Sequence, residues 1–141
     1  MTAKVIRRIH KLRKHVENEA RLALTVAERD RQRQEEVIQE LNDAIERSRE
    51  EVSAFNAEEL FYQQGWVLRM ELIRRGAEAL LMEKQREVSR RRGVLIEAAK
   101  EARILERVAE VREEAAEQEE RHRSGKVLDE TGVQGWWGKR G

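Results

Sequence analysis

The chain contains no cysteine and no proline, and aromatic residues make up only 4% of its 141 residues. The lack of cysteine excludes a disulfide framework and is compatible with a reducing compartment. The formal net charge of +1 gives no bulk electrostatic reason to expect DNA or a membrane as partner. The chain also lacks an 18-residue apolar run and an apolar leader segment, so we expect a cytoplasmic protein.

Charged residues, by contrast, are abundant at 40%. A composition rich in Ala, Glu, Arg, Leu and Lys is typical of a coiled coil or a long helix. Disorder is the alternative interpretation of so polar a chain. Because apolar residues recur at steps of three or four along most of the sequence, the periodicity favours helix. We therefore expect an all-α fold.

The longest periodic stretch runs from Asn56 to Arg123 and predicts one helix about 100 Å long. Such a helix has to lie against another long helix, and the first third of the chain supplies one. Between Glu28 and Glu36 the first helix has no apolar residue, so either polar groups face its partner there or the pairing is loose. The two apolar stripes are Val5, Ile9, Leu12, Val16, Ala23, Val26, Val37, Leu41, Ile45, Val52 and Phe55, and Leu60, Val67, Met70, Ile73, Ala77, Leu80, Val88, Leu95, Ala98, Ala102, Leu105 and Val108.

Local chemistry places the turn between these helices at about residues 53–56. Asn56 is a good N-cap, and Glu59 stands where a capping box requires a carboxylate. Phe55 and Leu60 occupy the two positions of a hydrophobic staple. The sequence thus predicts helix 1 at about 3–54 and helix 2 at about 57–123.

A turn at this place makes an antiparallel hairpin in which the numbers of facing residues add to about 110. Ile45 then faces Trp66, and Ala23 faces Val88. A parallel pairing would need two chains and would leave the Asn56 turn unexplained, so we expect a monomeric hairpin rather than a dimer. Residues Ala109 to Arg123 should project beyond the first helix. Ser124-Gly125 is the expected helix stop, and residues 124–141, with Trp136 and Trp137, are expected to form a flexible tail.

No pattern in the sequence indicates catalysis, a cofactor or a metal. His10, His15 and His122 do not have the spacing of a metal site, and we interpret them as surface residues. The carboxylates between Glu113 and Glu120 would need a concave, partly dry pocket to act as acids or bases, and two paired helices do not provide one. We therefore expect neither an enzyme nor a small-molecule substrate.

Two sets of residues, one basic and one aromatic, are candidate interaction sites. Basic residues gather between Lys4 and Lys14 and again at Arg90-Arg91-Arg92, and nucleic-acid binding is one interpretation of them. The apolar residues within the first group favour packing or protein docking instead. The second set comprises the four aromatic residues near the turn. The tip of two helices cannot bury four large rings, so we expect some of them to be exposed and to mark an interaction site. These residues are Phe55, Phe61, Tyr62 and Trp66.

The segments KLRKHVENEA (11–20) and EQEERHRSGKVLDE (117–130), in a chain of this length and layout, resemble the FliJ family of flagellar export proteins and the YscO-like stalk proteins of injectisomes. The resemblance covers nearly the whole chain except the Gly-rich end. It implies a two-helix coiled coil similar to the central stalk of rotary ATPases. Such a stalk would sit in the hexameric export ATPase at the cytoplasmic membrane, stimulate it, contact the export gate membrane protein and escort export chaperones.

The resemblance implies partner-binding residues at both ends of the hairpin. It does not distinguish a flagellar from an injectisome system. A generic coiled-coil adaptor is the alternative function, and a nucleic-acid-binding coiled coil is a further one. The residues expected at the ATPase end are Lys4, Arg7, Arg8, Lys11, Arg13, Lys14, Glu106, Glu110, Glu113 and Glu117. Those expected at the tip, toward the export gate, are Leu41, Phe55, Phe61, Tyr62, Trp66 and Ile73.

Overall fold

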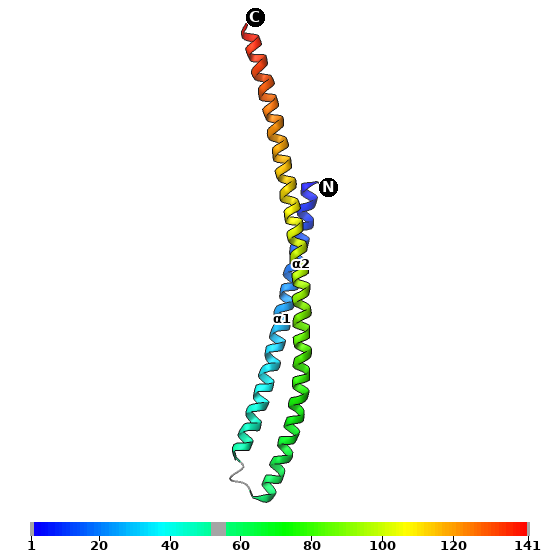
Figure 1. Ribbon diagram of the computed structural model, residues 1–141, viewed down its shortest axis with the longest axis vertical. Coiled ribbons are helices and arrows are strands. Elements are labelled where there is room, and N and C mark those ends of the chain that lie inside the picture. Colours follow the sequence, from blue (N-terminus) through cyan, green and yellow to red (C-terminus); the bar gives the residue numbers. More distant parts are fainter. Residues whose placement is uncertain (1, 52–55, 141) are drawn as a thin grey trace. The chain divides into compact units, whose positions relative to one another are not determined.

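The fold is an all-α hairpin of two long helices, α1 (Ala3–Glu50) and α2 (Ala57–Arg140), shown in Figure 1. The computed structural model describes residues 2–51 and 56–140, and the side chains of 2–51 and 56–132. Within these ranges the chain forms no strand. The expected fold class is confirmed.

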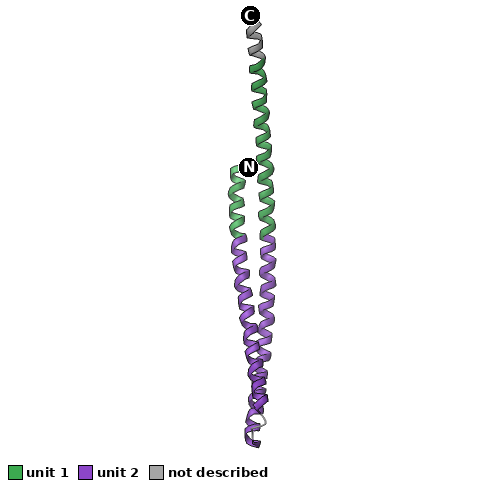
Figure 2. Cartoon of the chain, turned by 90° about the vertical axis from the view of Figure 1, so that its left-hand side faces the viewer, with its two compact units in different colours: residues 1–16, 98–141 green, residues 17–97 purple. Residues whose placement is uncertain are grey.

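The chain divides into two compact units, coloured separately in Figure 2. Unit 1 comprises Met1–Val16 and Ala98–Gly141, and unit 2 comprises Glu17–Glu97. Each unit contains a piece of α1 and a piece of α2 that run antiparallel and pack against each other. The packing of the two helices is therefore described below for each unit by itself.

The α2 side of the helix pairing follows the sequence pattern closely. Val67 and Val88 are buried in unit 2, and Ala98, Ala102 and Ala109 are buried in unit 1. The predicted stripe is wrong at three positions, where the side chains are exposed: Ile73, Leu80 and Val108. The buried and half-buried residues repeat with the three-four spacing of a coiled-coil seam.

The α1 side of the seam matches the predicted stripe at Ile45, whereas along most of α1 the buried residues belong to a neighbouring heptad row. Ile6 is buried in unit 1, and Ala20, Ala27 and Ile45 are buried in unit 2. The predicted stripe is exposed at Val5, Leu12, Val16, Val26 and Val37, whereas Ile9, Ala23 and Leu41 are half-buried. Two heptad rows one residue apart run along α1, and periodicity alone cannot tell which one meets the partner helix. Val52 and Phe55 lie outside the described residues.

Polar side chains face the partner helix in the apolar gap of α1, which confirms the first of the two predicted alternatives. Gln34 Nε2 donates a hydrogen bond to the carbonyl oxygen of Ala77 across the pair at 2.9 Å. Arg31, three residues earlier, is half-buried. A side chain-to-backbone bond of this kind satisfies a polar group that would be costly to bury alone.

The predicted register is wrong by one to ten residues, depending on the contact. The numbers of residues in contact across the two helices add to between 111, for Gln34 with Ala77, and 120, for Arg49 with Glu71, rather than to about 110. In unit 2, the first turns of α2 extend past the end of α1. Residues of α1 therefore face α2 residues with higher numbers than predicted. Further cross-helix pairs include Ser48–Gln63, Arg13–Glu101, Asn42–Arg74, Arg7–Glu113 and Glu28–Arg92.

The predicted capping box at the start of α2 is confirmed. The amide of Glu59 donates to Asn56 Oδ1 at 2.8 Å, and the amide of Asn56 donates to Glu59 Oε2 at 3.4 Å. These reciprocal bonds satisfy amides that have no partner inside the helix. Helix α1 ends at Glu50, earlier than the predicted 54. The staple between Phe55 and Leu60 lies outside the described residues because it involves Phe55.

The predicted helix stop at Ser124-Gly125 is wrong, because α2 continues to Arg140. A helix that ends at a glycine places it in the left-handed region, but none of the glycines in the described ranges has a positive φ. The predicted tail from residue 124 is thus helical as far as Arg140, and its expected flexibility stays a prediction. The side chains of Trp136 and Trp137 lie outside the described ones.

Comparing truncations of Ile45 and Val37 should distinguish the observed seam from the predicted stripe, which contains both residues. Ile45 is 2% exposed and Val37 is 43% exposed. Ile45→Ala should therefore lower the free energy of unfolding by about 2–4 kcal/mol, as large-to-small core substitutions do. Val37→Ala, its matched control, should cost less than about 1 kcal/mol. Urea unfolding followed by circular dichroism measures both, and equal losses would contradict the seam.

Removal of the N-cap should destabilise the start of α2. Asn56→Ala loses the bond from the Glu59 amide and should cost about 1 kcal/mol. Asn56→Asp keeps an acceptor oxygen and should retain most of the stability. Thermal unfolding of the two variants measures the difference, and equal midpoints would count against the cap.

Candidate interaction surfaces

Three cross-helix ion pairs lie along one edge of the seam, whereas a further pair, Arg13–Glu101, does not share their heptad positions. The residues of these three pairs are separated by whole heptads, at 7, 28 and 49 in α1 and at 113, 92 and 71 in α2. Arg7 meets Glu113 in unit 1 at 2.5 Å. In unit 2, Arg49 meets Glu71 at 2.6 Å, whereas Arg92 approaches Glu28 only to 4.0 Å. Residues at one heptad position share one side of a helix, so this edge is polar in each unit.

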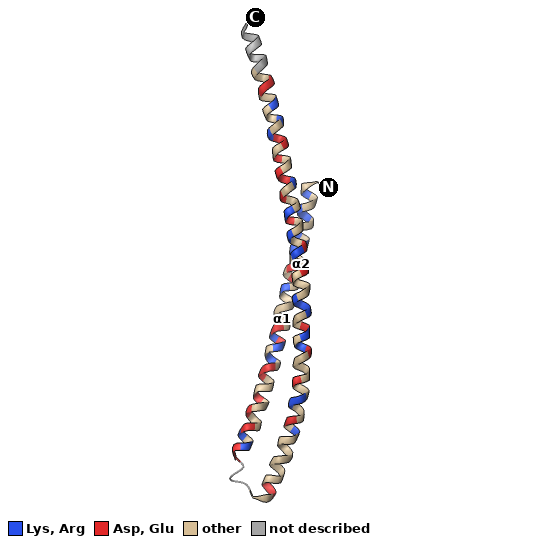
Figure 3. Cartoon of the chain, viewed as in Figure 1, with Lys and Arg blue, Asp and Glu red and all other residues tan. Residues whose placement is uncertain are grey.

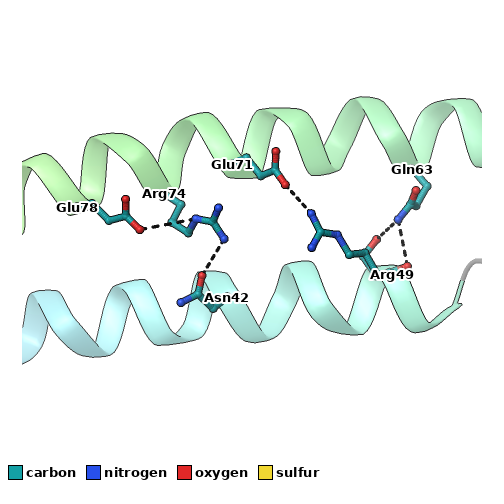
Figure 4. Close-up of polar contacts among 7 residues, drawn as sticks. Asn42, Arg49, Gln63, Glu71, Arg74 and Glu78 are labelled. Carbon is teal, nitrogen blue, oxygen red and sulfur yellow. Dashed lines mark hydrogen bonds and ion pairs between the residues drawn. The ribbon is translucent and has the colours of Figure 1, made fainter.

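Near the turn, further polar contacts join the helices of unit 2 along this edge (Figure 4). Gln63 Nε2 donates to the carbonyl oxygen and to the hydroxyl of Ser48, each at 3.1 Å. Arg74 Nη1 donates to Asn42 Oδ1 at 3.1 Å. These bonds connect residues far apart in sequence and hold the two helices in register.

The opposite edge of the seam carries several exposed aliphatic side chains. In an antiparallel coiled coil, the positions that flank the seam on this second side of α1 lie next to the corresponding positions of α2. In unit 1 these positions include Val16 and Val108, and in unit 2 they include Val37, Ile73 and Leu80, all of them exposed. One edge of each unit is thus polar and linked by ion pairs, while the other presents several aliphatic side chains to solvent. In unit 1 this second edge also includes Glu101, one heptad before Val108, which pairs with Arg13.

All ten residues expected at the ATPase end lie in unit 1, but several of them contact each other or nearby residues. Arg7 Nε and Nη2 donate to both carboxylate oxygens of Glu113, at 2.5 and 2.6 Å. Arg13 Nη1 donates to Glu101 at 2.8 Å. Glu110 contacts Arg107 and Glu117 contacts Arg121, while Lys14 also has a partner within the chain.

The remaining residues of this set present charge to solvent. Lys4, Arg8 and Lys11 are exposed and make no hydrogen bond or ion pair with any described residue. Glu106 is exposed as well. Helix α1 begins only at Ala3, and residues 114–132 of α2 are exposed apart from the half-buried Gly125. Unit 1 therefore combines free basic side chains with a single exposed helix.

The Arg7–Glu113 contact also changes the protonation of its two groups. The bidentate hydrogen bond raises the pKa of the Arg7 guanidinium and lowers the pKa of the Glu113 carboxyl below its usual value. The nearby opposite charge acts in the same direction, and partial desolvation opposes it. The contact thus favours the charged form of both residues.

The residues expected at the tip lie in unit 2 and are exposed to different degrees. Phe61 and Tyr62 are largely exposed, and their rings meet edge to face with centroids 5.9 Å apart. Ile73 is exposed, whereas Trp66 and Leu41 are half-buried. Phe55 lies outside the described residues. The α2 segment here carries no charge from Leu60 to Leu68, and the start of α2 is accordingly mostly tan in Figure 3.

Sequence reasoning missed the outer side of α2 near the turn. Leu68, Leu72 and Met82 point away from the seam and are exposed. The signal was present in the sequence, because from Leu60 to Met82 apolar residues occur all round the helix rather than in one stripe. A helix that is apolar all round usually has neighbours on several sides.

A conventional ligand site is not evident in the described part of the chain. No three His, Cys, Asp or Glu side chains come together there in a way that could hold a metal ion. None of the described helices is long and apolar enough to cross a membrane. Comparisons with protein-family models, with curated proteins and with solved structures found no match.

The Arg7–Glu113 pair should make the stability of the hairpin depend on acid pH. Because the pKa of Glu113 is lower in the folded state, its contribution is present above the ordinary Glu pKa of about 4.3 and is lost as pH falls through the folded pKa. Wild type should thus lose more stability than Glu113→Gln between neutral pH and about pH 2. Thermal unfolding followed by circular dichroism measures this loss. Glu114→Gln, an exposed neighbour, should behave like wild type.

Proposed function

We propose that this protein is the stalk-like coiled-coil component of a bacterial type III export apparatus, flagellar or injectisome, which binds and stimulates the hexameric export ATPase. The observation that carries the proposal is the shape of unit 1, in which a paired coiled coil continues as a single exposed helix where α2 extends past the start of α1 at Ala3. A stalk that enters a ring needs such a projecting element. The resemblance to FliJ and YscO-like proteins supplies the identity of the ring.

The chemistry of unit 1 suits a protein partner. An isolated helix of moderate length is only marginally stable in water, so the segment after Glu113 would gain order from the walls of a ring. Arg121 and Arg123 form ion pairs with Glu117 and Glu119 one turn earlier, at 3.5 and 2.7 Å, which supports the helix until it binds. Lys4, Arg8 and Lys11 would then meet acidic groups of the ATPase.

The tip-proximal part of unit 2 would contact the export gate. Phe61, Tyr62 and Ile73 present apolar surface in a charged chain, and such surface commonly marks interaction sites. In this proposal the protein works in the cytoplasm, peripheral to the membrane at the secretion apparatus. Escort of export chaperones is a further role that the resemblance implies.

Of the two alternatives to the stalk function, nucleic-acid binding has less support than a role as a generic coiled-coil adaptor. In the cluster 90–92, Arg90 and Arg91 both bond the carboxylate of Glu87, at 2.5 and 2.7 Å, and Arg92 lies near Glu28. The first two contacts lower the pKa of Glu87 through hydrogen bonding. These guanidinium groups are therefore partly neutralised within the chain. An adaptor would bind partners through the same exposed surfaces without affecting an ATPase.

The decisive experiment is the ATP hydrolysis rate of the same organism's export ATPase with and without this protein. We expect stimulation at near-stoichiometric amounts, and its loss when the chain is ended after Glu113, which keeps the Arg7 contact. Phe61→Ser, which alters only the tip, should stimulate as wild type does. If the helical full-length protein does not stimulate, the stalk proposal is wrong and the adaptor takes its place.

A further inference from the structure

The outer side of α2 in unit 2 is unusually apolar around Gly76. Leu72 and Ile73 lie one turn before this glycine, and Ala79 and Leu80 lie one turn after it. Leu72 is 65% exposed, and the other three side chains are exposed as well. The solvent-facing side of a helix is normally polar. An exposed apolar row commonly marks an interaction surface.

Gly76 itself has no packing role inside the chain. A methyl group at its Cα would meet no other part of the described structure within 4 Å. Glycine in the interior of a helix costs about 1 kcal/mol relative to alanine. What glycine offers in return is the close approach of another backbone, as at small-residue helix crossings.

The charges around Gly76 are arranged symmetrically. Arg69 lies two turns before it and Glu83 two turns after it, on the same side of α2. Both side chains are exposed, and neither makes a hydrogen bond or an ion pair with any described residue. When the helix direction is reversed about Gly76, the Arg and the Glu exchange places, and the pair Leu72-Ile73 exchanges places with Ala79-Leu80.

We propose that this face binds a second copy of the same chain, with the two α2 helices antiparallel and a two-fold axis at Gly76. Arg69 of each copy then meets Glu83 of the other, and Leu72 meets Leu80, so every contact occurs twice, as two-fold symmetry requires. A parallel arrangement would place like charges together, which is unfavourable. The charge pattern therefore selects both the partner and its direction.

This inference goes beyond the proposed function and departs from the monomer expected from the sequence. Ile73 belongs both to this face and to the residues expected to contact the export gate. The two copies would thus have to separate before that contact forms. The dimer would then be the resting form of the free protein.

A cysteine cross-link tests the position of the axis, because the chain has no cysteine of its own. In Gly76→Cys the new thiol lies on the proposed axis, opposite its counterpart in the other copy and within the short Cα separation that a disulfide needs. Gly93→Cys is the matched control, since Gly93 is also in α2 and equally open. Under mild oxidation, Gly76→Cys should form a disulfide dimer at least about tenfold faster. Equal rates would overturn the proposal.

Charge reversal tests the direction and needs only this chain, so it is independent of the ATPase experiment. Sedimentation should show wild type approaching twice 16.6 kDa as concentration rises. Arg69→Glu and Glu83→Arg should each raise the dimer dissociation constant about tenfold, and the double variant should restore it. Wild type that stays monomeric at every concentration would refute the proposal, as would a dimer unaffected by either reversal, which would use another face.

Discussion

The structure depends on the burial of one narrow side of each helix against the other. Long helices are not stable in water from propensity alone and need an apolar side to pack. Here the buried side is made largely of alanine, at Ala20 and Ala27 in unit 2 and at Ala98, Ala102 and Ala109 in unit 1. Small side chains bury little area each, so Ile6, Ile45, Val67 and Val88 supply most of the hydrophobic stabilisation.

A seam this narrow leaves the rest of each helix exposed, and the exposed edges differ in chemistry. One edge contains Arg7–Glu113 in unit 1 and Arg49–Glu71 in unit 2. Exposed ion pairs contribute little to stability, but their spacing by whole heptads matches only one register. The other edge has exposed aliphatic residues, although Glu101 of the Arg13–Glu101 pair also lies on it. The polar edge thus specifies how the helices align, and the exposed aliphatic residues are available for other proteins.

The exposed surfaces suggest a protein that works through its contacts. The single helix after Glu113, the basic residues of α1 in unit 1 and the apolar outer side of α2 in unit 2 each suit a different partner. The stalk that we propose would use the first two surfaces for the ATPase, and the self-association that we propose would use the third.

The sequence by itself determined the helices, the antiparallel hairpin and the cap at Asn56, because periodicity and capping are local and depend on residues a few positions apart. The sequence also identified most of the α2 residues that pack against α1. Only the tertiary structure decided which of the two heptad rows of α1 is buried, with Ile6 inside and Val5 outside, and which residues face each other. Neighbouring rows on one helix have nearly equal periodicity. The choice between them is made by the fit of small alanines and by the pairing of Gln34 or Arg49 with the opposite helix.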